Sequence, residues 1–216
     1  MTNKERRQFL ATGFLGGAGS WFHQHFAHAD TPHVPSTPKE IEGPFYPITP
    51  QKDKDFDLTH VDGRRDAAKG KVIEVSGAVV DETGLPIEDA TVEIWQANAA
   101  GRYAHPHDSN PAPLDPNFQG WATVLSGKKG GFRFRTVMPG SYPASSSWDR
   151  PPHIHFKVTK RGFSELITQM YFPGHPLNKK DRLLIRKSPA EQKLMIAEGL
   201  ASDDAVYRYK IILEKV

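Results

Sequence analysis

The chain has 216 residues, of which 38% are hydrophobic, so it is long enough for one buried core. Gly and Pro occur eighteen times each without a fixed period, which favours short strands joined by turns over a helical bundle. The sequence contains no cysteine, which excludes disulfides, Cys-zinc sites, iron–sulfur clusters and a thiol nucleophile. Any metal site must therefore use His, Tyr or carboxylate side chains.

The first 29 residues are typical of an export signal. Residues 4–10 are basic with a twin arginine, residues 11–19 are small and apolar, and Ala27-His-Ala29 has the form of a cleavage site. The apolar run is shorter than the about 20 residues that span a bilayer, so a stable membrane anchor is the weaker interpretation. We therefore expect a twin-arginine-type signal peptide over 1–29 and a periplasmic or secreted mature chain.

The charge of the mature chain argues against a nucleic-acid partner. The formal net charge of the whole chain is +3, and the signal region contributes three cations and one anion, which leaves the mature chain near +1. Binding to nucleic acid usually shows as a strongly basic surface. We expect no nucleic-acid partner.

Residues 30–70 form a Pro-rich linker and an irregular N-terminal arm that contains Glu42-Gly-Pro-Phe-Tyr-Pro47. From residue 71 onward, alternating and β-branched stretches predict strands. One short C-terminal helix is indicated by Ser188 as N-cap, Pro189 at its first position, Glu191 closing a capping box and Gly199 at its end. The predicted strands cover 72–80, 90–96, 121–125, 131–136, 153–159, 164–171 and 207–213.

The order of these elements predicts the fold class. The sequence has no internal repeat and no alternation of strands with helices, which favours an all-β fold over a parallel α/β sheet. The stretch Val75–Trp95 resembles the hairpin of prealbumin-like and collagen-adhesin-like sandwich modules. We therefore expect a single-domain β-sandwich with a prealbumin-like core over 71–216. Many such modules only bind or brace, so a non-catalytic exported binding module is one candidate function.

A His-x-His pattern stands in the predicted strand of Arg150–Val158, RPPHIHFKV. Side chains alternate between the two faces of a strand, so His153 and His155 share one face while Ile154 and Phe156 occupy the other. On spacing alone the two imidazoles are either metal ligands or a solvated pair. A second pattern, His105 and His107, is broken by a proline and predicts a loop with a surface or pocket-rim role.

Four blocks follow one another along the chain: Gln96–His107, Met138–Pro143, Arg150–Val158 and Leu166–Leu177. In this order they resemble the intradiol ring-cleavage dioxygenase family, and the combined order is more specific than any single block. The stretches Trp95–Tyr103 and Ala112–Phe118 are most similar to the protocatechuate 3,4-dioxygenase β-subunit branch. The resemblance covers roughly residue 42 to the C-terminus.

This resemblance implies a function and a set of site residues. It implies a non-haem Fe(III) enzyme that inserts O₂ between the two hydroxylated carbons of a catecholic substrate, giving a cis,cis-muconate-type dicarboxylic acid; with the N-terminal signal, we expect this enzyme to be exported. It implies that Arg150 and Gln169 line the substrate site and that Tyr142 also acts in catalysis by taking up a proton. The implied iron ligands are Tyr103, Tyr142, His153 and His155.

The implied ligand set is chemically consistent with ferric iron. Two tyrosinates and one hydroxide cancel the three positive charges, so that the centre can be buried. Free phenol has a pKa near 10, so coordination to the cation is needed to keep both tyrosines ionised at neutral pH. The resemblance implies a catecholic substrate with O₂ as co-substrate, and it leaves open whether the protein forms a homo-oligomer.

Two positions depart from the pattern of the β-subunit branch. Ala144 and a serine run stand where that branch has a tryptophan, which predicts a wider pocket. Asp149 precedes Arg150 and is a candidate ion-pair partner that would weaken the pull of this arginine on the substrate.

Overall fold

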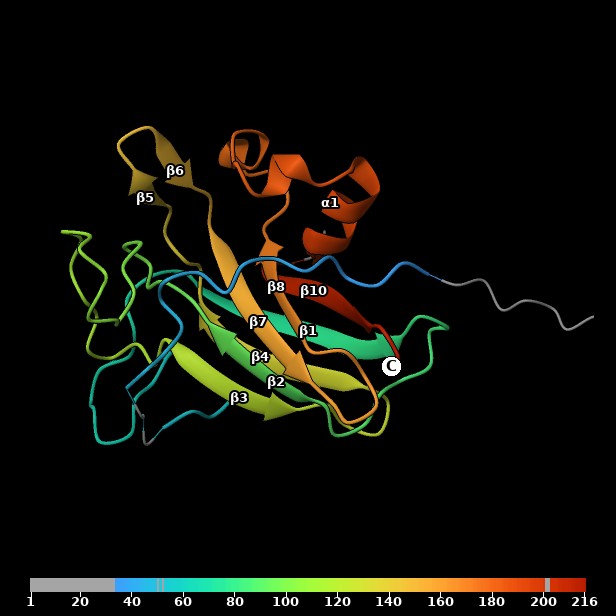
Figure 1. Ribbon diagram of the computed structural model, residues 1–216. Coiled ribbons are helices and arrows are strands. Elements are labelled where there is room, and N and C mark those ends of the chain that lie inside the picture. Colours follow the sequence, from blue (N-terminus) through green and yellow to red (C-terminus); the bar gives the residue numbers. More distant parts are fainter. Residues whose placement is uncertain (1–33, 50, 52, 201–202) are drawn as a thin grey trace, which may run out of the picture. The chain divides into compact units, whose positions relative to one another are not determined.

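The computed structural model describes residues 34–216 except 50, 52, 201 and 202 (Figure 1). The expected signal peptide over 1–29 lies outside the described residues. Within the described part, no helix is long and apolar enough to cross a membrane.

The described chain is a β-sandwich, which confirms the predicted fold class (Figure 1). One sheet has the strand order β4-β1-β10-β9 and the other has the order β3-β2-β7-β8. The first sheet consists of β1 (Val72–Asp81), β4 (Gly131–Val137), β9 (Glu198–Leu200) and β10 (Asp203–Leu213). The second consists of β2 (Thr91–Trp95), β3 (Trp121–Leu125), β7 (His153–Thr159) and β8 (Leu166–Tyr171).

The core fills the space between the two sheets, because alternate residues of each strand point inward. On β7, Ile154, Phe156 and Val158 are fully buried in this core. The ring of Phe156 lies 6.0 Å from that of Phe134 on β4, so the two sheets meet through aromatic contacts. The opposite face of β7 is therefore free to carry the two histidines.

The C-terminal strand β10 lies in the interior of its sheet and runs parallel to β1, with Val75 opposite Tyr207. At Gly77 of β1, a Cβ atom would collide with the ring of Phe132 and the backbone oxygen of Tyr209. A glycine is therefore required where β1 packs this closely against its neighbours.

The predicted helix forms as α1 (Pro189–Met195), and its capping box is confirmed. The Ser188 backbone N–H donates to Glu191 Oε2 at 2.7 Å, and the Glu191 N–H donates to Ser188 Oγ at 3.3 Å. The predicted end at Gly199 is wrong. The helix stops at Ile196, which is extended, because the following residues pair with β10 as strand β9 and place Gly199 opposite Tyr207.

The short hairpin of β5 (Tyr142–Ser145) and β6 (Trp148–Arg150) was not predicted. Two 3₁₀ turns, η1 (Pro176–Lys179) and η2 (Leu184–Arg186), follow β8. In Figure 1 the hairpin and these turns stand on the same side of the sandwich, beyond the start of β7 and the end of β8.

The N-terminal arm is irregular, as predicted, but it is bound to both sheets. The Thr37 N–H donates to the Ile212 carbonyl at 3.0 Å, and the Glu40 N–H donates to the Ile167 carbonyl at 2.8 Å. Leu58 is fully buried in the core. The arm therefore contributes backbone hydrogen bonds and apolar packing to the sandwich.

Candidate active site

The candidate site lies at one end of the sheet that contains β7. In the register of this sheet, Trp95 at the end of β2 is opposite His155, and His155 is opposite Gln169 on β8. His153 at the start of β7 is opposite Tyr171 at the end of β8. The adjacent ends of β7 and β8 therefore carry three of the polar side chains that the sequence singled out, His153, His155 and Gln169.

The structure brings the four predicted ligands together. The distance from His153 Nε2 is 3.5 Å to Tyr103 Oη and 3.4 Å to Tyr142 Oη. The rings of His153 and His155 are 4.9 Å apart. All four side chains are buried, and Tyr142 is the most exposed at 9%. Two phenol oxygens and two imidazoles, from a loop, a hairpin and a strand, thus share one buried spot.

Two glycines explain how the tyrosines meet. Gly101 has a φ of +83°, and a Cβ atom there would collide with the Ser141 carbonyl. A Cβ atom on Gly140 would collide with the backbone of residues 99–101. The two turns therefore pack back to back, which only residues without a side chain allow. This places the Tyr103 and Tyr142 rings 5.6 Å apart.

Neighbouring groups fix the imidazoles. His153 Nδ1 lies 2.7 Å from the Pro151 carbonyl, so it is assigned as the donor and its Nε2 carries the lone pair beside both phenols. The His155 ring stacks on Trp95 at 4.8 Å, and its Nδ1 is buried with no hydrogen-bond partner among the described residues. Such a buried orphan atom is unusual in a folded protein.

The donor set fits a metal ion held partly by tyrosine. In the described part of the chain, no three His, Asp or Glu side chains are grouped for metal binding, so a metal at this spot needs the phenol oxygens. Atoms bound to one metal at about 2 Å lie about 3 Å from one another, close to the O···N distances around His153. Phenolate oxygens are hard ligands and suit a highly charged cation.

Burial controls the protonation of these groups. Burial raises the pKa of Tyr103 well above its usual value and also raises that of Tyr142. Burial lowers the pKa of His155 to about 3 and lowers that of His153 well below its usual value. Without a cation the four groups are therefore neutral at pH 7. A bound metal ion reverses the preference of the phenols, because its charge favours their ionised form.

Arg150 lies at the end of β6 beside this spot and is 4% exposed. Its Nε donates to Asp181 Oδ2 at 2.7 Å, and its Nη2 donates to Gln169 Oε1 and to Tyr171 Oη. The expectation that Asp149 pairs with Arg150 is wrong. Asp149 is exposed on the other face of β6, and the buried Asp181 takes its place.

Gln169 connects Arg150 to the N-terminal arm. While its Oε1 accepts from Arg150, its Nε2 donates to the Ile41 carbonyl at 3.0 Å. The arm continues past this point so that Phe45 lies 4.8 Å from the ring of Tyr103. The structure therefore places both predicted substrate-site residues, Arg150 and Gln169, next to the tyrosine pair.

Three residues of the site were not singled out in the sequence. Asp181 and Tyr171 belong to the hydrogen-bond network of Arg150, and Phe45 packs on the predicted ligands. Asp181 stands 31 positions after Arg150 in a loop, without any local pattern. Phe45 belongs to the aromatic turn Glu42–Pro47 of the arm, and this pair of adjacent aromatic residues is a local pattern by which it could have been found.

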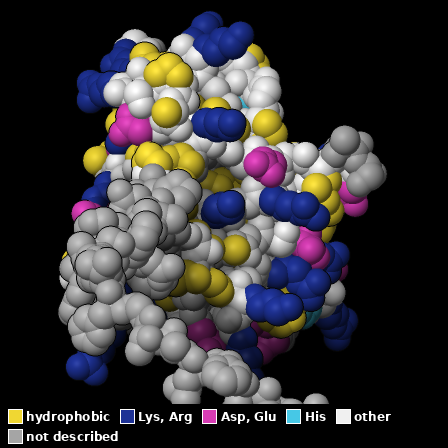
Figure 2. Space-filling model, turned by 90° about the vertical axis from the view of Figure 1, so that its right-hand side faces the viewer, with side chains coloured by type: hydrophobic (Ala, Val, Ile, Leu, Met, Phe, Trp, Pro, Cys, Tyr) yellow, Lys and Arg dark blue, Asp and Glu magenta, His cyan; other side chains and the backbone are white. Residues whose placement is uncertain are grey.

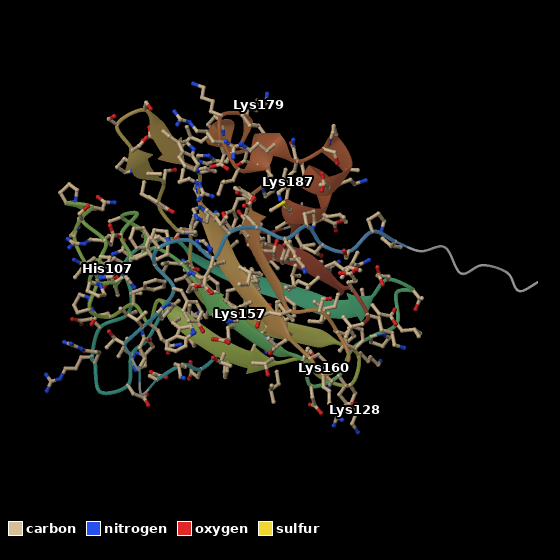
Figure 3. The ribbon with its side chains drawn as sticks, viewed as in Figure 1. His107, Lys128, Lys157, Lys160, Lys179 and Lys187 are labelled. Carbon is tan, nitrogen blue, oxygen red and sulfur yellow. The ribbon has the colours of Figure 1, made fainter. Side chains whose placement is uncertain are left out.

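The second His-x-His pattern is separate from the ligand group. The rings of His105 and His107 are 5.2 Å apart, and His107 is exposed on a loop at the edge of Figure 3. His105 contacts Phe45 at 5.8 Å and is partly buried. The predicted surface or rim position is confirmed.

A groove of about 920 Å³ lies elsewhere, between α1 and the outer face of the sheet that contains β1. Its lining includes Ala78, Leu194, Arg208 and Lys210, and none of the predicted site residues. Figure 2 shows, on the face turned toward the viewer, separate groups of hydrophobic side chains among Lys and Arg side chains. Because the groove is lined by none of the predicted site residues, and its described lining contains only one carboxylate and no histidine, we do not assign the active site to it.

The family of the chain follows from its sequence. The family model described as "Dioxygenase" (Dioxygenase_C) matches residues 41–215. The chain therefore belongs to this family, the intradiol ring-cleavage dioxygenases, as the resemblance implied.

Two relatives of known activity share long segments with the chain. The protocatechuate 3,4-dioxygenase beta chain of Burkholderia cepacia is 48% identical over 127 residues, which are 57% of this chain and 54% of that protein. The chlorocatechol 1,2-dioxygenase of Cupriavidus pinatubonensis is 34% identical over 157 residues, which are 64% of this chain and 55% of that protein. The chain thus matches little more than half the length of these relatives.

Solved structures share the fold. The dioxygenase domain of a dioxygenase carbohydrate-binding protein fusion from Streptomyces sp. SirexAA-E matches with a TM-score of 0.64 and 26% identity, over 84% of this chain and 100% of that one. The 3-chlorocatechol 1,2-dioxygenase of Rhodococcus opacus 1CP matches with a TM-score of 0.65 and 23% identity, over 85% of this chain and 74% of that one. At this identity the second match supports the fold alone.

Proposed function

We propose that this protein is a non-haem Fe(III) intradiol dioxygenase that acts on catechols. The observation that carries the proposal is the buried meeting point of two phenols and two imidazoles beside a buried arginine. Tyr103, Tyr142, His153 and His155 are the proposed iron ligands. When bound, Fe(III) supplies a Lewis acid that accepts the oxygens of the catechol.

Tyr142 is the proposed proton acceptor for the substrate. Of the two tyrosines it is the more exposed, and it begins the β5–β6 hairpin, whereas Tyr103 is held from behind by a hydrogen bond from its N–H to Asp108 at 2.7 Å. Burial raises the pKa of Tyr142, so its oxygen would hold a proton taken from the substrate readily. Tyr103 stays in place.

Arg150 is the proposed stabiliser of negative charge on the substrate. Its guanidinium is fixed by three hydrogen bonds in a buried site, where a preoriented cation acts more strongly than in water. Gln169 accepts a hydrogen bond from the guanidinium with its Oε1 and donates one to the N-terminal arm with its Nε2.

The proposed reaction adds both atoms of O₂ to the substrate. The bond between the two hydroxylated carbons breaks, and each carbon becomes a carboxylic acid, so that catechol (C₆H₆O₂) gives cis,cis-muconic acid (C₆H₆O₄). No external reductant is needed, because the ring supplies the electrons. Catechol, protocatechuate, hydroxyquinol and larger catechols are the candidate substrates.

The test combines a spectrum with product analysis. Tyrosinate bound to Fe(III) absorbs visible light, so the purified protein should be reddish and contain iron in a one-to-one ratio to the chain. A panel of catechols should show O₂ uptake and a dicarboxylic acid product. A colourless protein that holds zinc or no metal contradicts the proposal and favours a binding module, and a yellow semialdehyde product contradicts intradiol cleavage.

We also propose that the protein is exported through the signal of residues 1–29. The twin arginine followed by a short apolar run and an A-x-A site supports this. Residues 1–32 fused to a reporter should direct it out of the cytoplasm. Replacing Arg6 and Arg7 with Lys should abolish export, and continued export of the variant contradicts a twin-arginine route.

A further inference from the structure

Arg150 is held along one edge of its guanidinium. Nε donates to Asp181 Oδ2 at 2.7 Å, and Nη2 donates to Gln169 Oε1 and to Tyr171 Oη at 3.1 Å. No hydrogen bond from Nη1 to another described residue accompanies these three. A guanidinium has five N–H donors in a fixed planar fork, so fixing Nε and Nη2 also fixes the direction of Nη1.

Asp181 is itself immobilised. It is fully buried, and its Oδ1 accepts the backbone N–H groups of Leu183 at 3.1 Å and Leu184 at 2.9 Å. Tyr171 Oη also lies 3.2 Å from this oxygen. One carboxylate oxygen is therefore attached to the backbone at η2, while the other holds Arg150.

We propose that Asp181 is a positioning residue that directs Arg150 in the ring-cleavage reaction, by tying the Nε edge of the guanidinium to the backbone and leaving Nη1 to face the substrate. This inference rests on the proposed function. Asp181 touches neither the proposed iron ligands nor the substrate and acts through Arg150.

The geometry explains why a carboxylate is required. Both oxygens of Asp181 accept hydrogen bonds, one from the backbone and one from Arg150. An amide has one acceptor oxygen and one NH₂ donor, so either orientation of Asn at this position puts a donor against a donor. Asp181→Asn therefore breaks the tie with little change in size, and Asp181→Glu keeps both acceptors on a longer side chain.

The test compares Asp181→Asn with Asp149→Asn. The control removes an acidic group of the same kind next to Arg150 in sequence, but Asp149 is exposed and does not pair with it. Iron content, the visible spectrum and the Kd for a catechol under anaerobic conditions are measured first, and then kcat and KM. Wild-type protein without O₂ uptake contradicts the proposed function itself, before any variant is considered.

For Asp181→Asn we expect unchanged iron content, an unchanged visible band and a catechol Kd within about 3-fold of wild type, with a kcat lower by about 10-fold or more. Asp181→Glu should recover part of kcat, and Asp149→Asn should behave as wild type. A kcat for Asp181→Asn within 2-fold of wild type overturns the positioning role. Loss of iron together with activity also overturns it, because Asp181 would then support the metal centre as a whole.

Discussion

Burial acts to lower the pKa of Arg150, but neighbouring groups raise it more, among them the Asp181 carboxylate 2.7 Å away. Arg150 therefore keeps its charge although it is buried. The four proposed ligands behave differently, since burial leaves each of them neutral. A fixed positive charge therefore stands next to a neutral donor set. This arrangement favours negative charge that develops on a substrate during reaction.

Replacing Arg150 with Ala should lower kcat by on the order of 10²-fold, the effect of removing one preoriented donor, and should change KM much less. Arg150→Lys keeps a charge but loses the planar fork that contacts Asp181, Gln169 and Tyr171, so it should restore only part of the rate. Steady-state O₂ consumption measures both constants. A rise in KM alone would make Arg150 a substrate anchor.

Tyr103→Phe and Tyr142→Phe should each weaken or shift the visible band of the iron-loaded protein, because each removes one phenolate. Tyr46→Phe is the matched control. Tyr46 donates to Glu93 at 2.8 Å, and burial with this carboxylate raises its pKa to about 12, but it does not belong to the ligand group. Absorption spectra recorded at equal iron content test this. Unchanged spectra from both Tyr103→Phe and Tyr142→Phe refute the proposal that these tyrosines bind the iron.

At the level of elements, the arm is attached to the edge of β4. The Leu58 N–H donates to the Arg135 carbonyl at 2.8 Å, and the Asp57 carboxylate accepts from Thr59 and lies 3.3 Å from Arg135 Nη1. Burial acts to raise the pKa of Asp57, but these hydrogen bonds and the charge of Arg135 outweigh it, so the pKa is lowered. The ionised form of Asp57 is thus favoured in the folded protein.

Asp57→Asn should lower the free energy of unfolding by about 1 kcal/mol at pH 7, the value of a partly exposed charged hydrogen bond. Because the folded-state pKa is lower than the unfolded one, this stabilisation is complete above about pH 4 and is lost as the pH falls through the folded-state pKa. Urea unfolding at pH 7 and at decreasing pH measures it. Asp66→Asn, at an exposed position, is the control. If wild type and Asp57→Asn differ in free energy of unfolding by the same amount at every pH, the result argues against the ion pair.

Local patterns predicted most of the elements, because they depend on neighbours in sequence. The alternation in β7 correctly placed His153 and His155 on one face, although it left open whether that face is buried, and the capping box correctly placed the start of α1. The end of α1 was misplaced because Gly199 is used for strand pairing with β10, which no local pattern reveals. The partner of Arg150 was missed for the same reason, since Asp181 meets it only in the folded chain.

At the scale of the whole molecule, the proposed metal site would couple metal binding to folding. The ligands come from the loop after β2, from the β5–β6 hairpin and from β7, so a bound ion connects segments that are far apart in sequence. An ion that binds only the folded state at 1,000 times its Kd adds about 4 kcal/mol of stability. The proposed iron would therefore act as a link between these segments as well as a reagent.

Removing iron with a chelator should lower the Tm by on the order of 10 °C, which follows from that stabilisation in a domain of this size. His153→Ala should remove most of the difference between the iron-loaded and iron-free protein. His107→Ala, in the exposed His-x-His pattern, should preserve it. Calorimetry of wild type and both variants, each with and without iron, tests this, and an equal iron effect in both variants places the metal elsewhere.

The parallel pairing of β10 with β1 also has a consequence for biosynthesis. β1 begins at Val72 and β10 ends at Leu213, so β1 cannot complete its parallel pairing until residues 203–213 have been synthesised. Contacts between such distant residues form slowly, because a long loop must close before they contribute. Until the eleven-residue strand β10 has been made, one edge of β1 lacks its hydrogen-bonding partner, and such an unpaired edge favours association with other chains.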